Sequence, residues 1–247
     1  MDGYRATTYG EAFADVYDHW YADITSPADT AAFLRERVDG LVVELGSGTG
    51  RLAEPIRAAG LPVIGLDASM AMLRRSVDQV PLVPVVAADM IEPPIRPGSA
   101  AAVLVAFNTL FNLPTSAMQR MALTRAAGLL RSGGIVVIEA FVPGDGADER
   151  SDHVDVVRLD ADSVVLRVSR TDPETCTVSG HHVELRDGEP VRLRPWHLHY
   201  TDPMGLDRLA ESAGLSLVAR FGGWRGERFD DESPTHVSVF SAASTRR

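Results

Sequence analysis

The chain contains no lysine, and all 24 of its basic residues are arginine. A phosphate-binding loop of the G-x-x-x-x-G-K-S/T type needs a lysine, so this class of nucleotide site is excluded. The same absence excludes mechanisms that form a Schiff base with lysine, including the usual attachment of pyridoxal phosphate. Any cofactor chemistry must therefore be sought in other residue types.

Cysteine, long apolar runs and positive charge are scarce as well. The single Cys176 cannot form a disulfide within the chain or a cysteine zinc site, and without an H-E-x-x-H motif no metal is expected. No apolar run reaches about 18 residues, so no membrane span is expected, and residues 1–5 lack the apolar core of a signal peptide. A net charge of −10 disfavours a nucleic-acid partner. These absences predict a soluble cytoplasmic protein.

The stretch 42–50 carries the strongest functional signal. A short apolar run leads into Glu44, and Gly46, Gly48 and Gly50 follow at alternate positions before a helix-compatible run. Glycines let the backbone turn sharply and lie against a ligand, while the following helix points its free N–H groups at the turn. A dinucleotide fingerprint, G-x-G-x-x-G, would need its third glycine at Arg51. A site for a different small polar ligand is therefore predicted, although a tight turn that binds nothing is the alternative.

Two later strands also end in acids. The run 63–67 ends in Asp67, which lies 21 residues beyond Gly46, a spacing that suits an acid binding ribose hydroxyls. Ser69 then has the character of a helix N-cap. The run 85–89 ends in Asp89, although both acids could be ordinary helix-start or turn residues.

This order of strand ends resembles the class I S-adenosylmethionine-dependent methyltransferases, with E-L-G-S-G-T-G similar to their motif I. The resemblance implies that the glycine loop lies under the methionine part of the cofactor, that Asp67 binds the ribose, and that Asp89 and Met90 hold the adenine. S-adenosylmethionine is thus the expected cofactor and S-adenosylhomocysteine its product. The implied cofactor-binding residues are Tyr17, Tyr21, Glu44, Gly46, Ser47, Gly48, Gly50, Asp67, Ala68, Met72, Asp89, Met90 and Phe107.

The rest of the chain is consistent with a Rossmann-like, doubly wound α/β fold with a seven-stranded sheet. Strands are expected near 41–45, 62–66, 83–87, 101–107, 135–141, 216–221 and 236–242, with Gly133-Gly134 turning the chain into the fifth. Helices are expected within 11–38, after Ser69, from Thr115 to about 129, and over 203–213. With 247 residues, 45% of them hydrophobic, the chain can bury one sizeable core.

A β-rich segment interrupts this alternation. Runs at 154–159, 163–170, 176–185 and 191–200 are separated by turn signals, which predicts an inserted antiparallel β-sheet lid of about four strands. We divide the chain into an N-terminal helical cap (1–40), a cofactor-binding core (41–150 and 201–247) and an inserted substrate subdomain (151–200). The layout is similar to amino-sugar N-methyltransferases of bacterial secondary metabolism, and the exposed inserted sheet could make a homodimer contact.

Two segments are expected near the reaction centre. Tyr17-Asp18-His19-Trp20-Tyr21 matches a Y-D-x-x-Y pattern of the family, in which one tyrosine closes over the cofactor; an amphipathic helix with core aromatics is the alternative. The loop after the fourth strand, 107–112, would meet the acceptor, unless its asparagines only form a turn. The expected substrate-binding residues are Asn108, Phe111, His181 and Trp196.

The expected reaction is methyl transfer by direct in-line displacement to a nitrogen or oxygen of a small molecule, such as a natural product or its precursor. Histidine is the natural base near pH 7, and the inserted strands offer His181, His182, His197 and His199. His197 and His199 alternate on one face of a strand that could line the pocket, so these two and Tyr17 of the family pattern are the candidate catalytic residues. Positioning without a catalytic base is the alternative. A cyclase or ligand-binding regulator with the same fold stays open, and so does a nicotinamide-dependent oxidoreductase.

Overall fold

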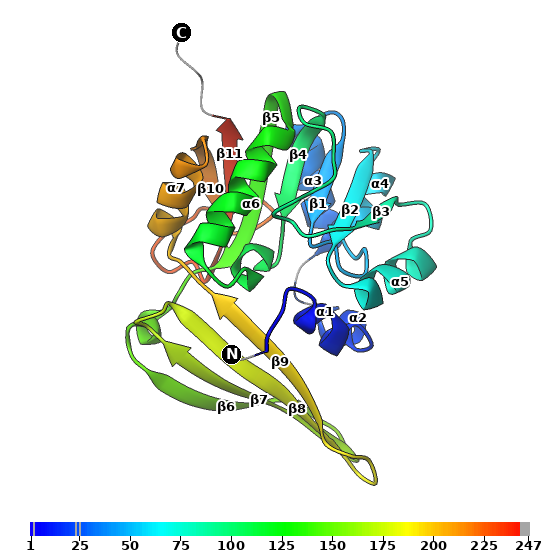
Figure 1. The fold of residues 1–247 in the computed structure, drawn as a ribbon, viewed down its shortest axis with the longest axis vertical. Coiled ribbons are helices and arrows are strands. Elements are labelled where there is room, and N and C mark those ends of the chain that lie inside the picture. Colours follow the sequence, from blue (N-terminus) through cyan, green and yellow to red (C-terminus); the bar gives the residue numbers. More distant parts are fainter. Residues whose placement is uncertain (2, 23, 25, 243–247) are drawn as a thin grey trace.

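The computed structural model describes residues 1, 3–22, 24 and 26–242. It contains a seven-stranded sheet with the order β10-β11-β5-β4-β1-β2-β3 and a separate antiparallel sheet with the order β6-β7-β8-β9 (Figure 1). The predicted Rossmann-like fold and its added antiparallel sheet are confirmed. The seven strands of the main sheet are β1 (Val42–Leu45), β2 (Val63–Asp67), β3 (Val85–Ala87), β4 (Ala100–Val105), β5 (Leu130–Phe141), β10 (Leu215–Phe221) and β11 (Thr235–Ala242).

The pairing explains why the central strands are so apolar. Strands β1 to β5 run parallel, and β11 is antiparallel to both of its neighbours, β5 and β10. Every residue of β1 and β4 is buried. Central parallel strands are covered on both faces, which requires a continuous apolar run instead of alternation.

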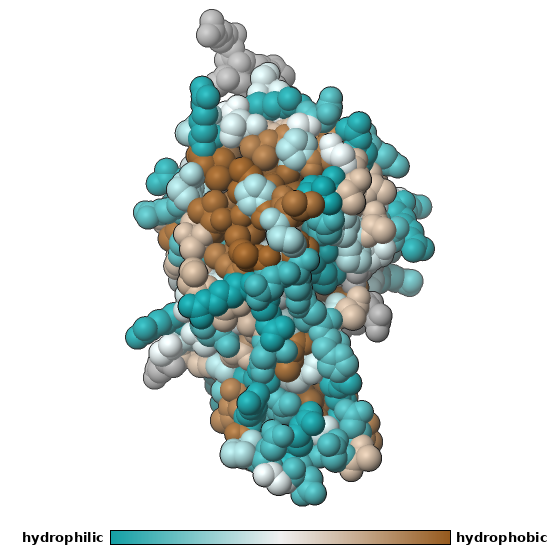
Figure 2. Space-filling view, turned by 90° about the vertical axis from the view of Figure 1, so that its right-hand side faces the viewer, coloured by the Kyte–Doolittle hydropathy of each residue, from teal (hydrophilic) through white to brown (hydrophobic). Residues whose placement is uncertain are grey.

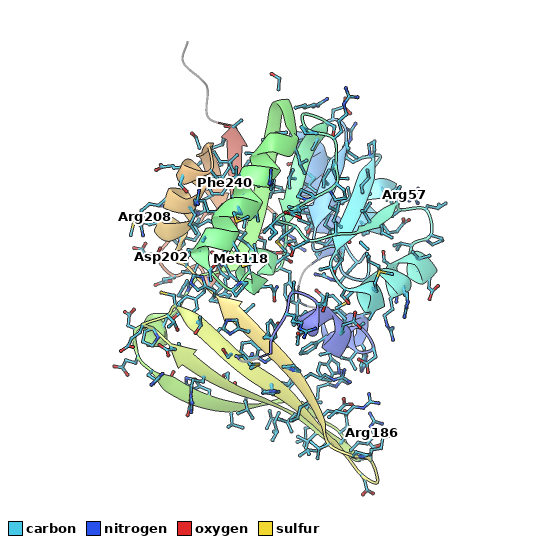
Figure 3. All side chains as sticks on the ribbon, viewed as in Figure 1. Arg57, Met118, Arg186, Asp202, Arg208 and Phe240 are labelled. Atoms are coloured by element: carbon cyan, nitrogen blue, oxygen red, sulfur yellow. The ribbon has the colours of Figure 1, made fainter. Side chains whose placement is uncertain are left out.

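Helices cover both faces of the main sheet, and alternate strand residues point into two cores. One core contains Val43 and Val103 with residues of α6 (Ser116–Leu129) and α7 (Pro203–Ser212). The other contains Val42 and Leu104 with residues of α3 (Pro27–Arg37) and α4 (Ala53–Ala58). Figure 3 shows Phe240 in the main sheet near α6 and α7, where it is fully buried.

Helix starts follow the predicted capping residues. The Ser69 side chain accepts from the Met72 N–H at the start of α5 (Met70–Gln79), and Thr115 accepts from Met118 at the start of α6. Each cap satisfies a backbone donor that has no partner within the helix.

The fifth strand differs from its prediction, because Gly133 and Gly134 lie within β5 instead of in a turn before it. Leu130 pairs with Ala100 and Ile135 with Ala102, so residues 131–134 stand opposite Ala101 alone. Gly133 has a φ of +75°, and a Cβ on Gly134 would lie 2.9 Å from the Ala100 carbonyl oxygen. The glycines therefore permit an irregular stretch of strand, not a strand boundary.

The inserted sheet comprises β6 (Ser151–Leu159), β7 (Ser163–Asp172), β8 (Thr177–Arg186) and β9 (Arg192–His199). It extends away from the main sheet, with Arg186 at its far end (Figure 3). Register places Asp155 opposite Arg167 and Arg167 opposite His182, while Gly180 faces Trp196. A Cβ on Gly180 would come within 2.7 Å of the Trp196 ring, so glycine there makes room for the indole.

Two short helices, α1 (Thr8–Phe13) and α2 (Tyr17–Trp20), lie between the main sheet and the inserted sheet. From here on, the cap means residues 8–21, which is a shorter segment than the predicted cap of residues 1–40. Glu11 accepts from the Ser69 hydroxyl at 3.1 Å, and Asp18 accepts from the Thr49 hydroxyl at 2.5 Å. Asp15 pairs with Arg194 of β9 at 2.5 Å. Acids about one helical turn apart therefore tie the cap to the glycine loop, to α5 and to the inserted sheet.

The Arg194 pairing should contribute measurably to stability. Its side chain is 5% exposed and also pairs with Glu184, which is 14% exposed, at 2.8 Å. We expect Arg194→Met to lower the free energy of unfolding by about 2 kcal/mol, because a largely buried carboxylate loses its partner. Urea unfolding would measure this. Arg186→Met is the control, since its ion pairs are longer, at 3.8 and 3.9 Å, and exposed. Equal losses in both variants would contradict the prediction.

None of the helices in the described part of the chain is long and apolar enough to cross a membrane. Seen from the side of edge strand β3, apolar side chains gather on the upper part of the molecule, above the more hydrophilic end of the inserted sheet (Figure 2). Val77 of α5 and Leu82 before β3 are each more than half exposed. The division into a cap, a core and a substrate subdomain at the stated boundaries stays a prediction.

Candidate active site

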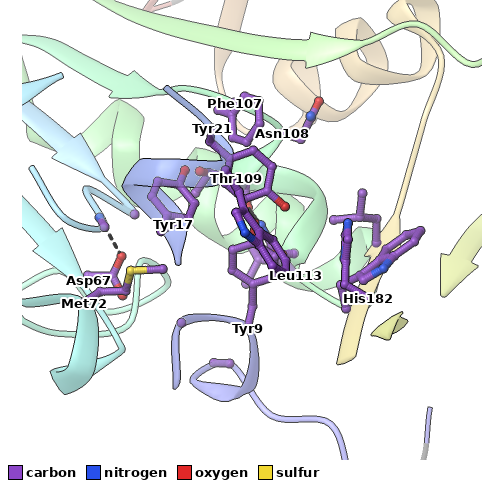
Figure 4. Close-up of a pocket in the computed structure, with 18 of the residues that line it drawn as sticks. Tyr9, Tyr17, Tyr21, Asp67, Met72, Phe107, Asn108, Thr109, Leu113 and His182 are labelled. Atoms are coloured by element: carbon purple, nitrogen blue, oxygen red, sulfur yellow. Dashed lines mark hydrogen bonds between the residues drawn. The ribbon is translucent and has the colours of Figure 1, made fainter. Parts of the chain in front are cut away.

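A cavity of about 740 Å³ lies between the carboxyl ends of β1 to β4, the cap and the inserted sheet (Figure 4). The loops after four neighbouring strands of the main sheet contribute Gly46, Asp67, Asp89 and Phe107 to its wall. Crevices at the carboxyl edge of parallel sheets are the usual ligand sites of such folds. The fold thus brings together strand ends that are distant in the sequence. Gly46 and Phe107 are 61 residues apart.

The glycines of the β1 loop have separate roles. Gly46 and Gly48 line the cavity and take left-handed φ values of +73° and +56°. A Cβ on Gly46 would lie 2.3 Å from Cγ2 of Thr109, whereas a Cβ on Gly48 would meet no atom within 4 Å. Gly46 therefore permits close packing of the β4 loop, and Gly48 keeps space beside the loop open for a ligand.

Asp67 is held by backbone groups at the end of β2. Its Oδ2 accepts from the Gly48 N–H at 2.9 Å, drawn as a dashed line in Figure 4, and its Oδ1 accepts from the Ser69 N–H at 2.8 Å. Burial raises its pKa, an effect that these N–H groups oppose. Each carboxylate oxygen keeps a lone pair for a further donor. The open cradle at Gly48 and this fixed acid fit a ligand with an adenosyl group, such as S-adenosylmethionine, with Ala68, Met72, Asp89 and Met90 in the same wall.

Glu44 lies beneath this loop at the carboxyl end of β1. It is 3% exposed, and its Oε2 has no hydrogen-bond partner among the described residues. Burial raises its pKa to about 8, although Arg51 opposes the shift. The carboxyl group is therefore mostly protonated at pH 7.

The cap closes the cavity with aromatic rings. Tyr9, Tyr17, Trp20 and Tyr21 line it, with ring centroids 6.4 Å apart for Tyr9 and Tyr17 and 4.9 Å apart for Tyr17 and Tyr21. The Tyr21 ring lies 5.5 Å from that of Phe107. Burial raises the pKa of Tyr17 well above its usual value, so its hydroxyl stays neutral. These rings form an aromatic side of the space beside the β1 and β4 loops.

The inserted sheet supplies the opposite wall through every second residue of its strands. Asp155 accepts from Arg167 at 2.9 Å across β6 and β7, and both side chains are about half exposed. Burial lowers the pKa of His182 to about 4, helped by Arg167 and Arg194, so its imidazole is neutral at pH 7. The wall residues of this sheet are His153, Asp155, Val157, Arg167, Ser169, Val178, His182, Trp196 and Leu198.

Four residues that were predicted to catalyse the reaction or to bind the substrate do not line the cavity: His181, His197, His199 and Phe111. His197 and His199 alternate with Trp196 and Leu198, and it is Trp196 and Leu198 that line the cavity, so the expected orientation of β9 is wrong. The His197 Nδ1 instead lies 2.7 Å from the Ser179 hydroxyl, and its ring contacts Tyr4.

The same alternation on β8 turns His181 away from the cavity and His182 toward it. Phe111, in the 3-10 helix Thr109–Asn112, is fully buried in the main core, with its ring 5.3 Å from Phe141. Neither His181 nor Phe111 therefore reaches a ligand in the cavity.

Three residues predicted to bind the cofactor support the cavity wall without forming it. Glu44 is buried below the loop, and the Ser47 side chain packs under Gly65, where a Cβ would come within 2.6 Å of its hydroxyl. A Cβ on Gly50 would lie 2.5 Å from Val80, so this glycine lets the loop pack against the end of α5. Direct ligand contact by these residues stays a prediction.

Several wall residues were missed. Tyr9 shares helical spacing with Phe13 and Tyr17, a pattern of aromatics that continues the Tyr17–Tyr21 motif toward the N-terminus. Asp155 and Arg167 share one face of the inserted sheet with His182, which is one of the four histidines predicted as a possible base. Alternation alone does not tell which face of the sheet is covered. Leu113 comes directly after the predicted loop 107–112 and carries no separate sequence signal.

Comparison with known proteins relates this arrangement to one fold and one chemistry. Residues 42–134 match a family model described as a methyltransferase domain. The solved CcbJ methyltransferase from Streptomyces caelestis is 35% identical with a TM-score of 0.91, covering 98% of this chain and 100% of that chain. No curated protein matches the sequence significantly.

More distant solved structures share the fold. CalS10 from Micromonospora echinaspora, described as an amino pentose methyltransferase, is 24% identical with a TM-score of 0.70, covering 92% of this chain and 97% of that chain. The sugar N-methyltransferase KedS8 from a Streptoalloteichus species is 21% identical with a TM-score of 0.69, covering 97% and 98%.

Proposed function

Because the chain belongs to the S-adenosylmethionine-dependent methyltransferases, we propose that it methylates a nitrogen or oxygen of a small natural product or of its precursor. The observation that carries the proposal is the two-sided cavity. Gly46, Gly48, Asp67 and Asp89 form one side, and the inserted sheet forms the other. A ligand held on the first side meets an enclosed space large enough for a second molecule.

When bound, S-adenosylmethionine supplies a methyl group that its sulfonium charge has already activated. The residues of this chain hold the reactants and exclude water. Asp67 and Asp89 accept hydrogen bonds from the ligand, and Tyr17, Tyr21 and Phe107 shield the space next to the glycine loop. The residues of the opposite wall would hold the acceptor in position for in-line transfer of that methyl group.

The polar groups that can contact the acceptor are those in the cavity wall. His197 and His199 face away from it and take no part in direct contact. His182 is neutral at pH 7 and lines the wall, and its Nδ1 has no partner among the described residues. A neutral imidazole can accept a hydrogen bond from an amine or hydroxyl. We assign His182 the role of orienting the acceptor. Asp155, which lies across Arg167 from His182 on the same face, is assigned the role of attracting a protonated amine.

Two related proteins support an amine-bearing acceptor. CalS10 is described as an amino pentose methyltransferase and KedS8 as a sugar N-methyltransferase. The cavity wall of this chain offers hydrogen-bonding groups from His153, Asp155, Arg167 and Ser169, and it also contains the Trp196 ring. This combination suits a hydroxylated molecule with an apolar face. The cytoplasmic location and the homodimer stay predictions.

The test is transfer of a labelled methyl group. The purified chain is incubated with methyl-labelled S-adenosylmethionine and a panel of amino sugars, amino acids and phenols, and the products are identified by mass spectrometry. We expect a labelled N- or O-methyl product. Cofactor binding without transfer to any acceptor would favour a cyclase or a ligand-binding regulator, and binding of a nicotinamide cofactor instead would refute the proposal.

Tyr17→Phe tests the role of the cap in turnover. The variant keeps the ring that shields the cavity and loses the hydroxyl, so we expect turnover to fall by about 3- to 10-fold with little change in cofactor affinity. The assay uses the acceptor that the panel identifies. Tyr4→Phe is the control, because Tyr4 contacts His197 on the other face of β9. A Tyr17→Phe enzyme with full turnover would remove the hydroxyl from the mechanism.

A further inference from the structure

The loop that follows β4 contains two adjacent residues in a strained conformation. Phe107 and Asn108 have φ values of +49° and +60°, in the left-handed region that non-glycine residues rarely adopt. Asparagine tolerates this region, but a bulky phenylalanine there is an outlier. Such strain persists only where surrounding contacts hold it, and it is concentrated at functional sites.

The backbone N–H groups of both residues are held by β5. One oxygen of the Glu139 carboxylate, Oε2, accepts from the Phe107 N–H at 2.8 Å, and the Glu139 backbone carbonyl accepts from the Asn108 N–H at 3.0 Å. The Asn108 Oδ1 in turn accepts from the Phe141 N–H at 2.7 Å. Both strained residues are thus fixed to the end of the neighbouring strand.

Glu139 is itself fixed by a residue remote in sequence. Its other oxygen, Oε1, accepts from the Trp224 Nε1–H at 2.8 Å. Trp224 lies in the loop between β10 and β11, is 7% exposed, and packs its ring 5.3 Å from that of Phe33. Neither Glu139 nor Trp224 lines the cavity. The direct hydrogen bonds by which this pair can act on a ligand are those to Phe107 and Asn108.

The loop that Glu139 holds forms the end of the cavity beside the glycine loop. Phe107, Asn108 and Thr109 all line the cavity, and the Thr109 methyl occupies the space that a Cβ on Gly46 would fill. The Phe107 ring lies 5.5 Å from that of Tyr21, and Figure 4 draws Tyr17 between Tyr21 and Asp67. A shift of this loop would thus alter the space beside Gly46 and leave the contacts of Asp67 unchanged.

We propose that Glu139 is a positioning residue for the cofactor, holding Phe107 and Asn108 in their strained conformation while Trp224 orients its carboxylate. The loop so fixed shapes the part of the cavity that receives the methionine end of S-adenosylmethionine. This inference rests on the proposed function, because it requires that the cofactor occupies the cavity with its adenosyl end at Asp67 and Asp89.

Calorimetric titration of the full chain with three ligands distinguishes the adenosyl end of the site from the methionine end. The ligands are adenosine, S-adenosylhomocysteine and S-adenosylmethionine. For Glu139→Ala we expect about tenfold weaker binding of the two methionine-bearing ligands, because charge-assisted hydrogen bonds are lost. Adenosine affinity should change by less than about twofold, since the Asp67 contacts remain. Glu139→Gln keeps an acceptor oxygen for the Phe107 N–H, so it should restore part of the affinity.

A matched pair of variants separates positioning from packing. Trp224→Phe retains an aromatic ring against Phe33 but loses the N–H, and we expect about threefold weaker S-adenosylhomocysteine binding with unchanged adenosine binding. Phe33→Leu disturbs the same packing without touching the hydrogen bond. It should lower the melting temperature and leave all three affinities unchanged.

Hydrogen exchange of peptides covering 104–112 provides a second measurement, because loss of the Glu139 bond should speed exchange of the Phe107 amide. If Glu139→Ala does not fold, the Glu139→Gln and Trp224→Phe variants test the positioning role instead. The inference is wrong if Trp224→Phe leaves both the ligand affinities and this exchange unchanged, or if all three ligands weaken equally. If the unmodified chain binds none of them, the proposed function itself fails.

Discussion

Replacing Gly48 with valine should weaken S-adenosylmethionine binding at least 100-fold, or by about 3 kcal/mol. Gly48 lines the cavity with a φ of +56°, and a Cβ there would enter space that no protein atom occupies within 4 Å. The branched side chain would fill that space, and its backbone would be strained as well. Calorimetric titration of the variant with S-adenosylmethionine measures the loss.

Gly60→Val is the matched control for backbone strain. Gly60 has a φ of +85°, has nothing within 4 Å of a built Cβ, and is exposed at the end of α4, outside the cavity wall. The two variants should lose comparable thermal stability, but only Gly48→Val should lose ligand affinity. Wild-type affinity in Gly48→Val, or equal loss in both variants, would show that the glycine loop does not cradle the ligand.

The second large effect is the pH dependence of stability caused by Glu44. In the unfolded chain this carboxyl group ionises near the ordinary glutamate pKa of 4.5, whereas in the folded protein burial raises its pKa to about 8. Between these values folding requires uptake of a proton, so the free energy of unfolding falls as pH rises from about 4.5 to 8. The stabilising contribution is complete below the lower value and is lost as pH rises through the upper one.

Glu44→Gln removes that dependence, because an amide has no proton to lose. The variant should resemble the wild type at pH 4.5 and exceed its free energy of unfolding by up to about 4 kcal/mol at pH 8. Urea unfolding at several pH values measures the difference, and Glu36→Gln, whose side chain is 73% exposed, serves as the control. A difference between Glu44→Gln and wild type that does not grow with pH would mean that Glu44 is already ionised in the folded protein.

The side of the cavity formed by the main sheet was largely predictable because its signals are local. A run of apolar residues followed by glycines or an acid marks the end of a buried parallel strand, and neighbouring strand ends meet at one edge of the sheet. Gly46, Gly48, Asp67 and Asp89 therefore line one cavity, as their order along the chain indicates. The capping residues Ser69 and Thr115 are recognisable for the same local reason.

The inserted sheet was predictable as strands but not as a cavity wall. Its outer face carries apolar residues that are exposed, including Val154, Val156 and Leu193, each at least 60% exposed. The cavity face carries polar residues such as Asp155 and Arg167. Because polarity does not distinguish the two faces, a choice between them from hydrophobic pattern is unsafe, and it failed for His197 and His199.

The strained β4 loop was not predictable either. Nothing in the neighbouring sequence requires Phe107 to adopt a left-handed conformation, and asparagine at 108 is equally suited to an ordinary turn. The contacts that impose it come from Glu139 and Trp224, 32 and 117 residues beyond Phe107. A conformation imposed by partners so distant in the chain has no local signature.

The construction of the inserted sheet offers a route to altered selectivity. His153, Asp155, Val157 and Ser169 line the cavity from β6 and β7, and none of them belongs to the hydrophobic clusters that stabilise the fold. A combinatorial library confined to these four codons would vary which molecules are admitted while sparing both the core and the glycine loop. Evolution and engineering alike can therefore diversify acceptors here at little risk to folding.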